Sequence, residues 1–340
     1  MKVTHFIAST PRRFVYACIG TALAAPLLIA LPHALSSYWQ SVLVIFTLNV
    51  IMVMGYRVIT TMGGWSFAHV ATAGLGAYTT AILMTLENPW SFWITLFLGA
   101  GIAGAFAFII AYPVLRTRHY YFFLSTFAAG EALRQAFIQF KGITGGGFGV
   151  AFIPRPESIL GIDFESTTGF YYLVLAVALI VWLSLYRFDL SRTGRTIKAV
   201  AANEELSESI GINTWGHRTL PFVLGSVIAG LAGALSANFN ATINPADFGS
   251  IMMFKLVAAA IVGGVTTFFG PILGLLYLTI LEEGFRTFAE WIPLLWGASV
   301  ITVLMIWSGG LEMAIIKGWI GIKHIYTKRQ GIKNSGKTSR

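Results

Sequence analysis

Long uninterrupted apolar runs recur through almost the whole chain, and they restrict its fold more than any other feature. Residues 91–115, for example, contain no charged side chain. A run of this length fits the roughly 17–25 residues that a helix needs to cross a bilayer. Hydrophobic residues make up 56% of the 340-residue sequence and charged residues 11%, which is too little polar surface for a soluble core of this size. The sequence therefore predicts an all-α, polytopic transmembrane helical bundle rather than a β-barrel, which would show short alternating segments.

The apolar runs predict about ten spans, of which the third and ninth are incomplete or re-entrant candidates. The first run follows Arg12 and Arg13, so a signal peptide is the alternative, but its apolar stretch is long for one and we favour an uncleaved span. The predicted spans are approximately 14–35, 39–59, 67–86, 91–115, 120–140, 169–186, 219–240, 250–268, 271–288 and 291–309.

The distribution of Lys and Arg predicts that both termini are cytoplasmic. With the N-terminus inside, nearly all of the 23 basic residues fall in cytoplasmic segments, as membrane topology favours. This bias explains the net charge of +9 without nucleic acid as a partner. The exceptions, inside spans or outside, are Arg134, Lys141, Arg155, Lys255 and Arg286.

The predicted topology divides the chain into a transmembrane domain, residues 1–310, and a basic cytoplasmic tail, residues 311–340. An exterior loop at 141–168 is rich in Gly and Pro, which excludes a spanning helix but allows short helical pieces. A second glycine-rich stretch, GGVTTFFGPILG (Gly263–Gly274), predicts either a broken or re-entrant helix or close helix packing. Small residues in IAGLAGAL (Ile228–Leu235) favour close packing.

A long polar cytoplasmic segment, residues 187–218, separates two membrane-length runs. Its second half predicts a short capped helix: Asn203 suits the N-cap and Glu204 the positively polarised first turn. Gly211 suits the position just past the helix end. A short, partly apolar helix on this side of a membrane protein is a candidate docking site for a soluble partner.

The sequence predicts no catalytic site, cofactor or metal centre. Residues 331–338, GIKNSGKT, match the phosphate-loop pattern, but that mechanism needs a strand before the loop and a helix after it. Here the chain ends two residues later, so we do not expect a nucleotide site. We find no metal-ligand spacing and no Ser/His/Asp arrangement, so the chain is not predicted to be an enzyme.

Polar residues inside spans are candidates for lining a translocation path because they are unfavourable in lipid. Glu131 and Arg134 lie one helical turn apart, as either a structural ion pair or part of the path. His69 is either a hydrogen-bonded packing residue or a path residue. Asn238, at the end of the seventh span, has helix capping as its simpler explanation.

Four blocks of sequence resemble the permease subunits of branched-chain amino acid ABC transporters, a family that includes urea and short-amide permeases. Together they cover most of residues 40–290 in the expected order. Where this family commonly has an Arg-Glu pair, this chain has Ala201 and Ala202. The blocks are LNVIMVMGYRVITTMGGWSFAHVATAGLGAYT (Leu48–Thr79), LRTRHYYFFLSTFAAGEALR (Leu115–Arg134), SRTGRTIKAVAANEELSESIGI (Ser191–Ile212) and the stretch from Ile228 to Gly274.

The resemblance implies one permease subunit of an ATP-driven importer in the cell inner membrane. Its implied partners are two ABC ATPase subunits, a second permease subunit and an extracytoplasmic solute-binding protein. The solute would be a branched-chain amino acid or a related small polar molecule. The ATPase would dock on a coupling loop that includes Thr193, Gly194, Arg195, Asn203, Glu204, Glu208 and Gly211.

Two other classes of membrane protein stay open from the residues alone. A stand-alone secondary transporter driven by an ion gradient would be expected to show inverted repeats around a midplane ion site, and no convincing internal repeat is visible. A structural or assembly protein would not need the long capped loop at 187–218. Both are weaker interpretations than the importer subunit.

Overall fold

The computed structural model describes residues 20, 26–158, 163–265, 267–307 and 309–314. Half of the first predicted span, the basic tail beyond residue 314 and the phosphate-loop pattern at 331–338 lie outside these residues. The chain divides into two compact units, residues 1–256 and 257–340, and each is described by itself.

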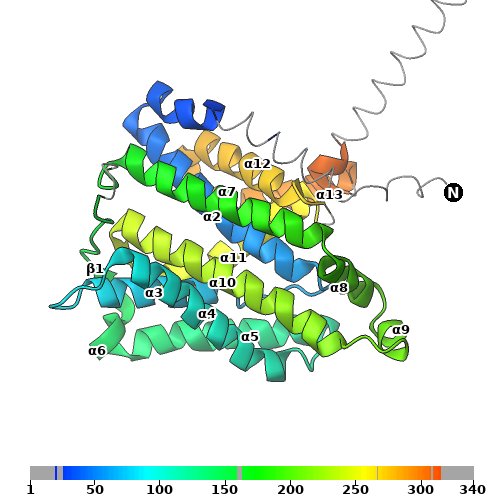
Figure 1. Ribbon diagram of the computed structural model, residues 1–340. Coiled ribbons are helices and arrows are strands. Elements are labelled where there is room, and N and C mark those ends of the chain that lie inside the picture. The colour runs from blue at the N-terminus through cyan, green and yellow to red at the C-terminus, as the bar shows by residue number, and fades with distance from the viewer. Residues whose placement is uncertain (1–19, 21–25, 159–162, 266, 308, 315–340) are drawn as a thin grey trace, which may run out of the picture. The chain divides into compact units, whose positions relative to one another are not determined.

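Long helices that lie side by side build the first unit (Figure 1). Each forms because an apolar run buries its backbone polar groups in its own hydrogen bonds, as a membrane-spanning segment must. A short 3-10 helix, η1 (Leu31–Ala34), precedes them. The long helices are α2 (Ser37–Thr60), α3 (His69–Met84), α4 (Phe92–Val114), α5 (His119–Gln139), α7 (Thr167–Leu190) and α10 (Thr214–Asn240).

The predicted exterior loop contains the short helical pieces that the sequence allowed, α6 (Lys141–Thr144) and η2 (Gly146–Phe148). It also contains a strand that was not predicted. This two-residue strand, β1 (Val150–Ala151), pairs antiparallel with a second strand, β2 (Thr242–Ile243), so that Val150 lies opposite Ile243. The pairing ties the loop to the segment after α10, which continues into η3 (Pro245–Phe248).

The helix α11 (Ser250–Gly263) leads into the second unit, which contains α12 (Gly270–Gly284), η4 (Arg286–Trp291) and α13 (Ile292–Ile306). The predicted eighth and ninth spans, 250–268 and 271–288, are both too long. The helix α11 ends at Gly263 because Gly264 adopts a positive φ of 117°, a conformation that glycine tolerates best. A break between two helices is therefore present at this glycine-rich stretch, as one of the two interpretations predicted.

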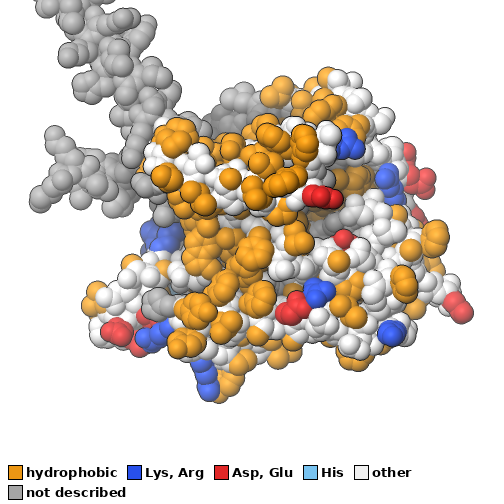
Figure 2. Space-filling model, turned by 180° about the vertical axis from the view of Figure 1, so that it is seen from behind, with side chains coloured by type: hydrophobic (Ala, Val, Ile, Leu, Met, Phe, Trp, Pro, Cys, Tyr) orange, Lys and Arg blue, Asp and Glu red, His pale blue; other side chains and the backbone are white. Residues whose placement is uncertain are grey.

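Six helices in the described part of the chain are long and apolar enough to cross a membrane. The third and ninth predicted spans correspond to α3 and α12, with 16 and 15 residues, and neither reaches that length. Hydrophobic side chains cover much of the surface shown in Figure 2, as membrane-embedded helices require. The six helices lie at Ser37–Thr60, Phe92–Val114, Thr167–Leu190, Thr214–Asn240, Pro245–Gly263 and Ile292–Ala314.

The helix α10 lies at the centre of the first unit and packs against α2, α3 and α4. Glycine allows this approach. A Cβ on Gly230 would lie 2.5 Å from the Ala103 Cβ, and one on Gly233 would collide with the backbone of Ala73. The small residues in Ile228–Leu235 therefore serve close helix packing, as the sequence predicted.

Candidate functional site

The predicted capped helix is present as α9 (Glu204–Ser209). The Asn203 side chain accepts a hydrogen bond from the Leu206 backbone N–H at 2.9 Å, so Asn203 is the N-cap. Gly211 has a φ of 83° and follows the end of α9 in the left-handed conformation that favours glycine. The capping prediction for this segment is confirmed.

A second helix, α8 (Arg192–Ala202), fills the first half of the segment and was not predicted. The Ser191 hydroxyl caps it by accepting from the Gly194 backbone N–H at 3.0 Å. Ile197 and Val200 are buried, and Ile197 belongs to a hydrophobic cluster with Ile59, Phe122 and further residues of α2, α4, α5 and α10. The helix α8 is thus anchored in the core beneath it.

Three further residues that were predicted for the coupling loop, Thr193, Arg195 and Glu208, also lie in this segment. Thr193 is half-buried, next to Gly194 in the first turn of α8. Arg195 donates to the Leu190 carbonyl at 2.8 Å, and Glu208 accepts from the Thr214 hydroxyl at 2.6 Å. These bonds hold the two ends of the segment onto the helices α7 and α10 that flank it.

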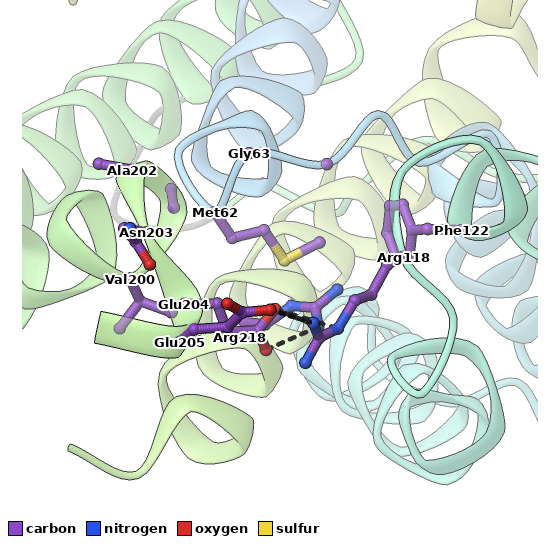
Figure 3. Close-up of a pocket in the computed structure, with 12 residues that line it drawn as sticks. Met62, Gly63, Arg118, Phe122, Val200, Ala202, Asn203, Glu204, Glu205 and Arg218 are labelled. Atoms are coloured by element: carbon purple, nitrogen blue, oxygen red, sulfur yellow. Dashed lines mark hydrogen bonds and ion pairs between the residues drawn. The ribbon is translucent and has the colours of Figure 1, made fainter. Parts of the chain in front are cut away.

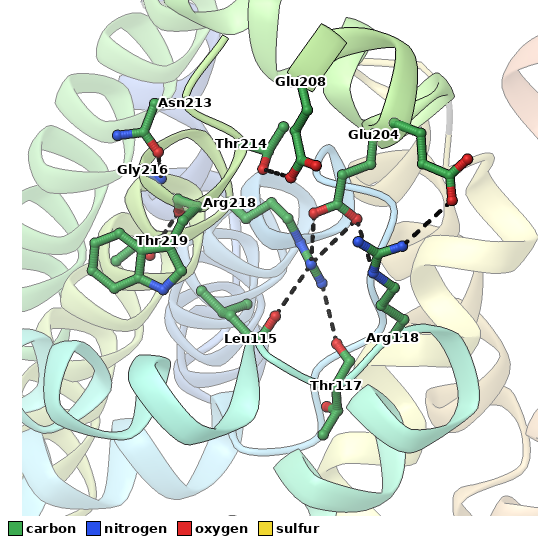
Figure 4. A network of polar contacts seen from close by, with 12 residues as sticks. Leu115, Thr117, Arg118, Glu204, Glu208, Asn213, Thr214, Gly216, Arg218 and Thr219 are labelled. Carbon is green, nitrogen blue, oxygen red and sulfur yellow. Dashed lines mark hydrogen bonds and ion pairs between the residues drawn. The ribbon is translucent and has the colours of Figure 1, made fainter. Parts of the chain in front are cut away.

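Glu204 points inward rather than toward solvent (Figure 4). Its carboxylate lies 3.1 Å from the Arg218 guanidinium and 3.5 Å from that of Arg118, and its side chain is 22% exposed. Arg218 also donates to the backbone carbonyls of Leu115 and Thr117, in the turn between α4 and α5. The carboxylate therefore joins α9, the start of α10 and the α4–α5 turn.

A second acidic side chain secures α8. The Asp189 carboxylate lies 2.8 Å from the Lys198 ammonium and 3.2 Å from the guanidinium of Arg57, which is almost fully buried at the end of α2. Arg57, Arg118, Asp189 and Arg218 were not predicted as site residues, although the sequence placed the three arginines on one side of the membrane. Their partners are distant in the sequence, so no periodic pattern could reveal them.

A cavity of about 270 Å³ lies beside this network (Figure 3). Gly63 and Gly64 line one side, Arg118 and Phe122 another, and the α8–α9 junction a third. Ala201 and Ala202 are among the lining residues at the α8–α9 junction.

Apolar side chains in α9, directly after it and at the start of α10 are exposed. Leu206 is 61% exposed and Ile210 is 70% exposed, and Trp215 at the start of α10 is also exposed. We call Leu206, Ile210 and Trp215 the apolar tip. These three side chains are open to contact by another protein.

Two of the four predicted path residues are enclosed by helix packing. His69 is fully buried, and its Nε2 donates to the Met52 carbonyl at 2.9 Å. Asn238 is also fully buried and donates to the Ala234 carbonyl of its own helix at 2.9 Å, so the capping explanation is wrong. Glu131 and Arg134 do meet, with bonds of 2.5 Å and 2.9 Å between them.

Comparison with known proteins shows the family. Residues 38–308 match the family described as the branched-chain amino acid transport system permease component, and the chain belongs to that family. It is a multi-pass membrane permease component. No solved structure matches.

Curated relatives agree with this assignment. The chain is 26% identical to the high-affinity branched-chain amino acid transport system permease protein LivM of Salmonella typhimurium, over 86% of this chain and 73% of LivM. It is 25% identical to the permease protein LivH of Escherichia coli K12, over 68% and 80%. It is also 26% identical to the autoinducer 2 import system permease protein LsrC of Enterobacter sp. 638, over 54% of each chain.

Proposed function

We propose that this permease component works in an ATP-driven importer of branched-chain amino acids or a related small polar solute. ATP would be hydrolysed by two separate ATPase subunits, as the family resemblance implies. A second permease subunit would complete the path and an extracytoplasmic binding protein would deliver the solute. The names of the LivM and LivH relatives support a branched-chain amino acid as the solute. The name of LsrC supports another small polar solute as the alternative.

We further propose ten spans in the cell inner membrane with both termini cytoplasmic. The distribution of Lys and Arg supports this arrangement. It places α8 and α9 on the cytoplasmic side, where ATPase subunits are found, and the β1–β2 pair on the exterior. The helices α3, α5 and α12 would then complete spans together with their flanking residues.

The observation that supports coupling best is the way α8 and α9 are held. A rigid segment can pass a mechanical movement from one protein to another, whereas a mobile loop would absorb it. Here Ile197, Asp189 and Glu204 attach the segment to four different long helices or their connecting turns. The apolar tip is left outside as the contact surface for the ATPase.

Reconstitution in vesicles tests the proposal. The chain together with the second permease, both ATPases and the binding protein should take up radiolabelled leucine only when ATP is supplied. The chain alone should take up none, even with an ion gradient across the membrane. Uptake by the chain alone would show a secondary transporter and would contradict the proposal.

A further inference from the structure

The helix α5 carries three polar side chains together at its surface, although it lies among apolar helices. Arg134 donates to the Glu131 carboxylate through Nε at 2.9 Å and Nη2 at 2.5 Å, and Gln135 donates to the same carboxylate at 2.9 Å. The Glu131 and Arg134 side chains are 38% and 23% exposed, and Gln135 is exposed. We call these three residues the α5 polar cluster.

The position of the cluster along α5 makes this exposure informative. At 1.5 Å per residue, Glu131 lies about 18 Å from the His119 end of the helix and about 12 Å from the Gln139 end. If α5 crosses the bilayer, the cluster is at hydrocarbon depth, where ionisable groups facing lipid are strongly disfavoured. This part of α5 must therefore face either water or another protein.

One small hollow touches the cluster, and a second hollow on the same unit shares a lining residue with the first. Glu131 itself lines a small one of about 20 Å³, whose walls include Phe67, Phe127 and Phe248. Phe248 also lines a second hollow of about 60 Å³. The polar residues of the second hollow are Asn49, Ser236, Asn240 and Asp247.

We propose that the α5 polar cluster is a contact site for a zwitterionic amino acid on the solute path. The Glu131 carboxylate would accept from the solute ammonium, and the Arg134 guanidinium would donate to the solute carboxylate. Gln135 would hold Glu131 while Arg134 turns to the solute. Phe127, which is 38% exposed beside Glu131, provides an apolar surface for a branched side chain. This assignment rests on the proposed function.

The chemistry distinguishes the cluster from an ordinary structural ion pair. A pair that only neutralises two charges inside a bundle would be enclosed by the helices, as Arg57 is. Here the pair is partly open, and it presents one acid and one base side by side, as a zwitterion requires. The path residues His69 and Asn238, in contrast, are closed off by helix packing.

Thiol labelling tests whether the cluster faces water. In the complete transporter, with Cys18 replaced by Ser, Gln135→Cys should react with a charged, membrane-impermeant thiol reagent at least tenfold faster than Ile109→Cys. Ile109 is the matched control because it is highly exposed on the apolar helix α4. Equal, slow labelling of both, with and without ATP, would overturn the proposal.

Transport by charge variants tests the role of the cluster. Glu131→Gln and Arg134→Gln should each lower ATP-dependent leucine uptake by about tenfold or more, the effect of losing a charge-assisted hydrogen bond. ATPase stimulation by the loaded binding protein and co-purification of the second permease should stay unchanged. Glu87→Gln, an exposed acid in the loop after α3, is the control and should transport normally.

Two outcomes would identify a different role and overturn the proposal. Full recovery of uptake in the swapped variant Glu131→Arg/Arg134→Glu would show a purely structural ion pair. Loss of the second permease from the single variants would show a subunit interface. A wild-type complex that hydrolyses ATP but moves no leucine would contradict the proposed amino acid solute, whereas the labelling result does not depend on which solute is carried.

Discussion

At the scale of single residues, Glu204 changes role between sequence and structure. The resemblance implied that it lies in the ATPase contact, but its carboxylate faces Arg118 and Arg218 inside the protein. It therefore positions α9 through these two guanidinium groups. A partly buried carboxylate shared by two guanidinium groups is also costly to remove, because Arg218 then loses its carboxylate partner and Arg118 keeps only the exposed Glu205.

We expect Glu204→Gln to uncouple ATP hydrolysis from transport. Loss of hydrogen bonds to charged groups weakens the attachment of α9 by roughly 1.5–3 kcal/mol, so the ratio of solute moved to ATP hydrolysed should fall about tenfold. Glu204→Lys should be more severe because it brings three cations together. The measurement is leucine uptake and phosphate release in the same vesicles.

Glu205→Gln is the matched control for this pair of variants. Its carboxylate is 86% exposed and lies 3.8 Å from Arg118, so the ion pair is screened by solvent and contributes little. The coupling ratio should stay within about twofold of wild type. An equal loss in Glu204→Gln and Glu205→Gln would contradict the inward role of Glu204.

Gly211 supports a second prediction at the residue scale. Its φ of 83° cannot be reached by proline, whose ring fixes φ near −65°, and its N–H donates to the Glu208 carbonyl at 2.9 Å. Gly211→Pro should therefore displace the end of α9 and abolish coupled transport while the chain still enters the membrane. Gly211→Ala should have a milder effect, since a left-handed alanine costs about 1–2 kcal/mol.

The control for Gly211 is Gly216→Ala in the first turn of α10. A Cβ there would make only ordinary contacts, the nearest 3.4 Å from the Asn213 side chain. Membrane fractionation shows whether each variant is inserted, and vesicle assays measure its coupling of ATP hydrolysis to transport. Together they distinguish the two positions. Normal coupling in Gly211→Pro would show that the end of α9 has no part in docking.

At the scale of elements, α8 and α9 divide their work. The helix α8 is amphipathic and buries Ile197 and Val200, while α9 buries little and exposes Leu206 and Ile210. One element is therefore an anchor and the other a contact surface. Burial of α9 by a partner would remove apolar surface from water, which favours association.

We expect the double variant Leu206→Ser/Ile210→Ser to weaken binding of the ATPase subunits. Full burial of one Leu or Ile side chain contributes roughly 1.5–3 kcal/mol, so affinity should fall at least about tenfold. Leu86→Ser, at an exposed leucine in the loop after α3, should leave affinity unchanged. The affinity of the ATPase subunits for the permease is measured in detergent by co-purification and by binding to the immobilised permease. Unchanged affinity in the double variant would show that the apolar tip is not part of the interface.

At the scale of the whole molecule, the two predicted sides of the membrane give a direct test of topology. In a Cys18→Ser background, Glu205→Cys should be labelled by an impermeant thiol reagent only in inside-out vesicles. Phe148→Cys, at a nearly fully exposed residue of η2, should be labelled only from the outside of intact cells. Labelling of both from the same side would contradict the proposed orientation.

The sequence by itself determined the class of protein and much of the site. Apolar runs determine helices because lipid offers no partners for backbone groups, and the distribution of Lys and Arg predicts a topology. The capped helix α9 was predictable because Asn203, Glu204 and Gly211 act within one turn of their own position. Close packing at Gly230 and Gly233 was predictable from the spacing of small residues, whereas their partners on α4 and α3 were not.

Only the tertiary structure decided which side chains face one another. Glu204 meets Arg118 and Arg218, and Asp189 meets Arg57, through contacts that depend on how distant helices pack. The same packing closes off His69 and Asn238 and leaves the Glu131–Arg134 pair partly open. Side chains on a helix repeat with its period, which indicates a shared face, but the neighbour that covers that face is set by the whole bundle.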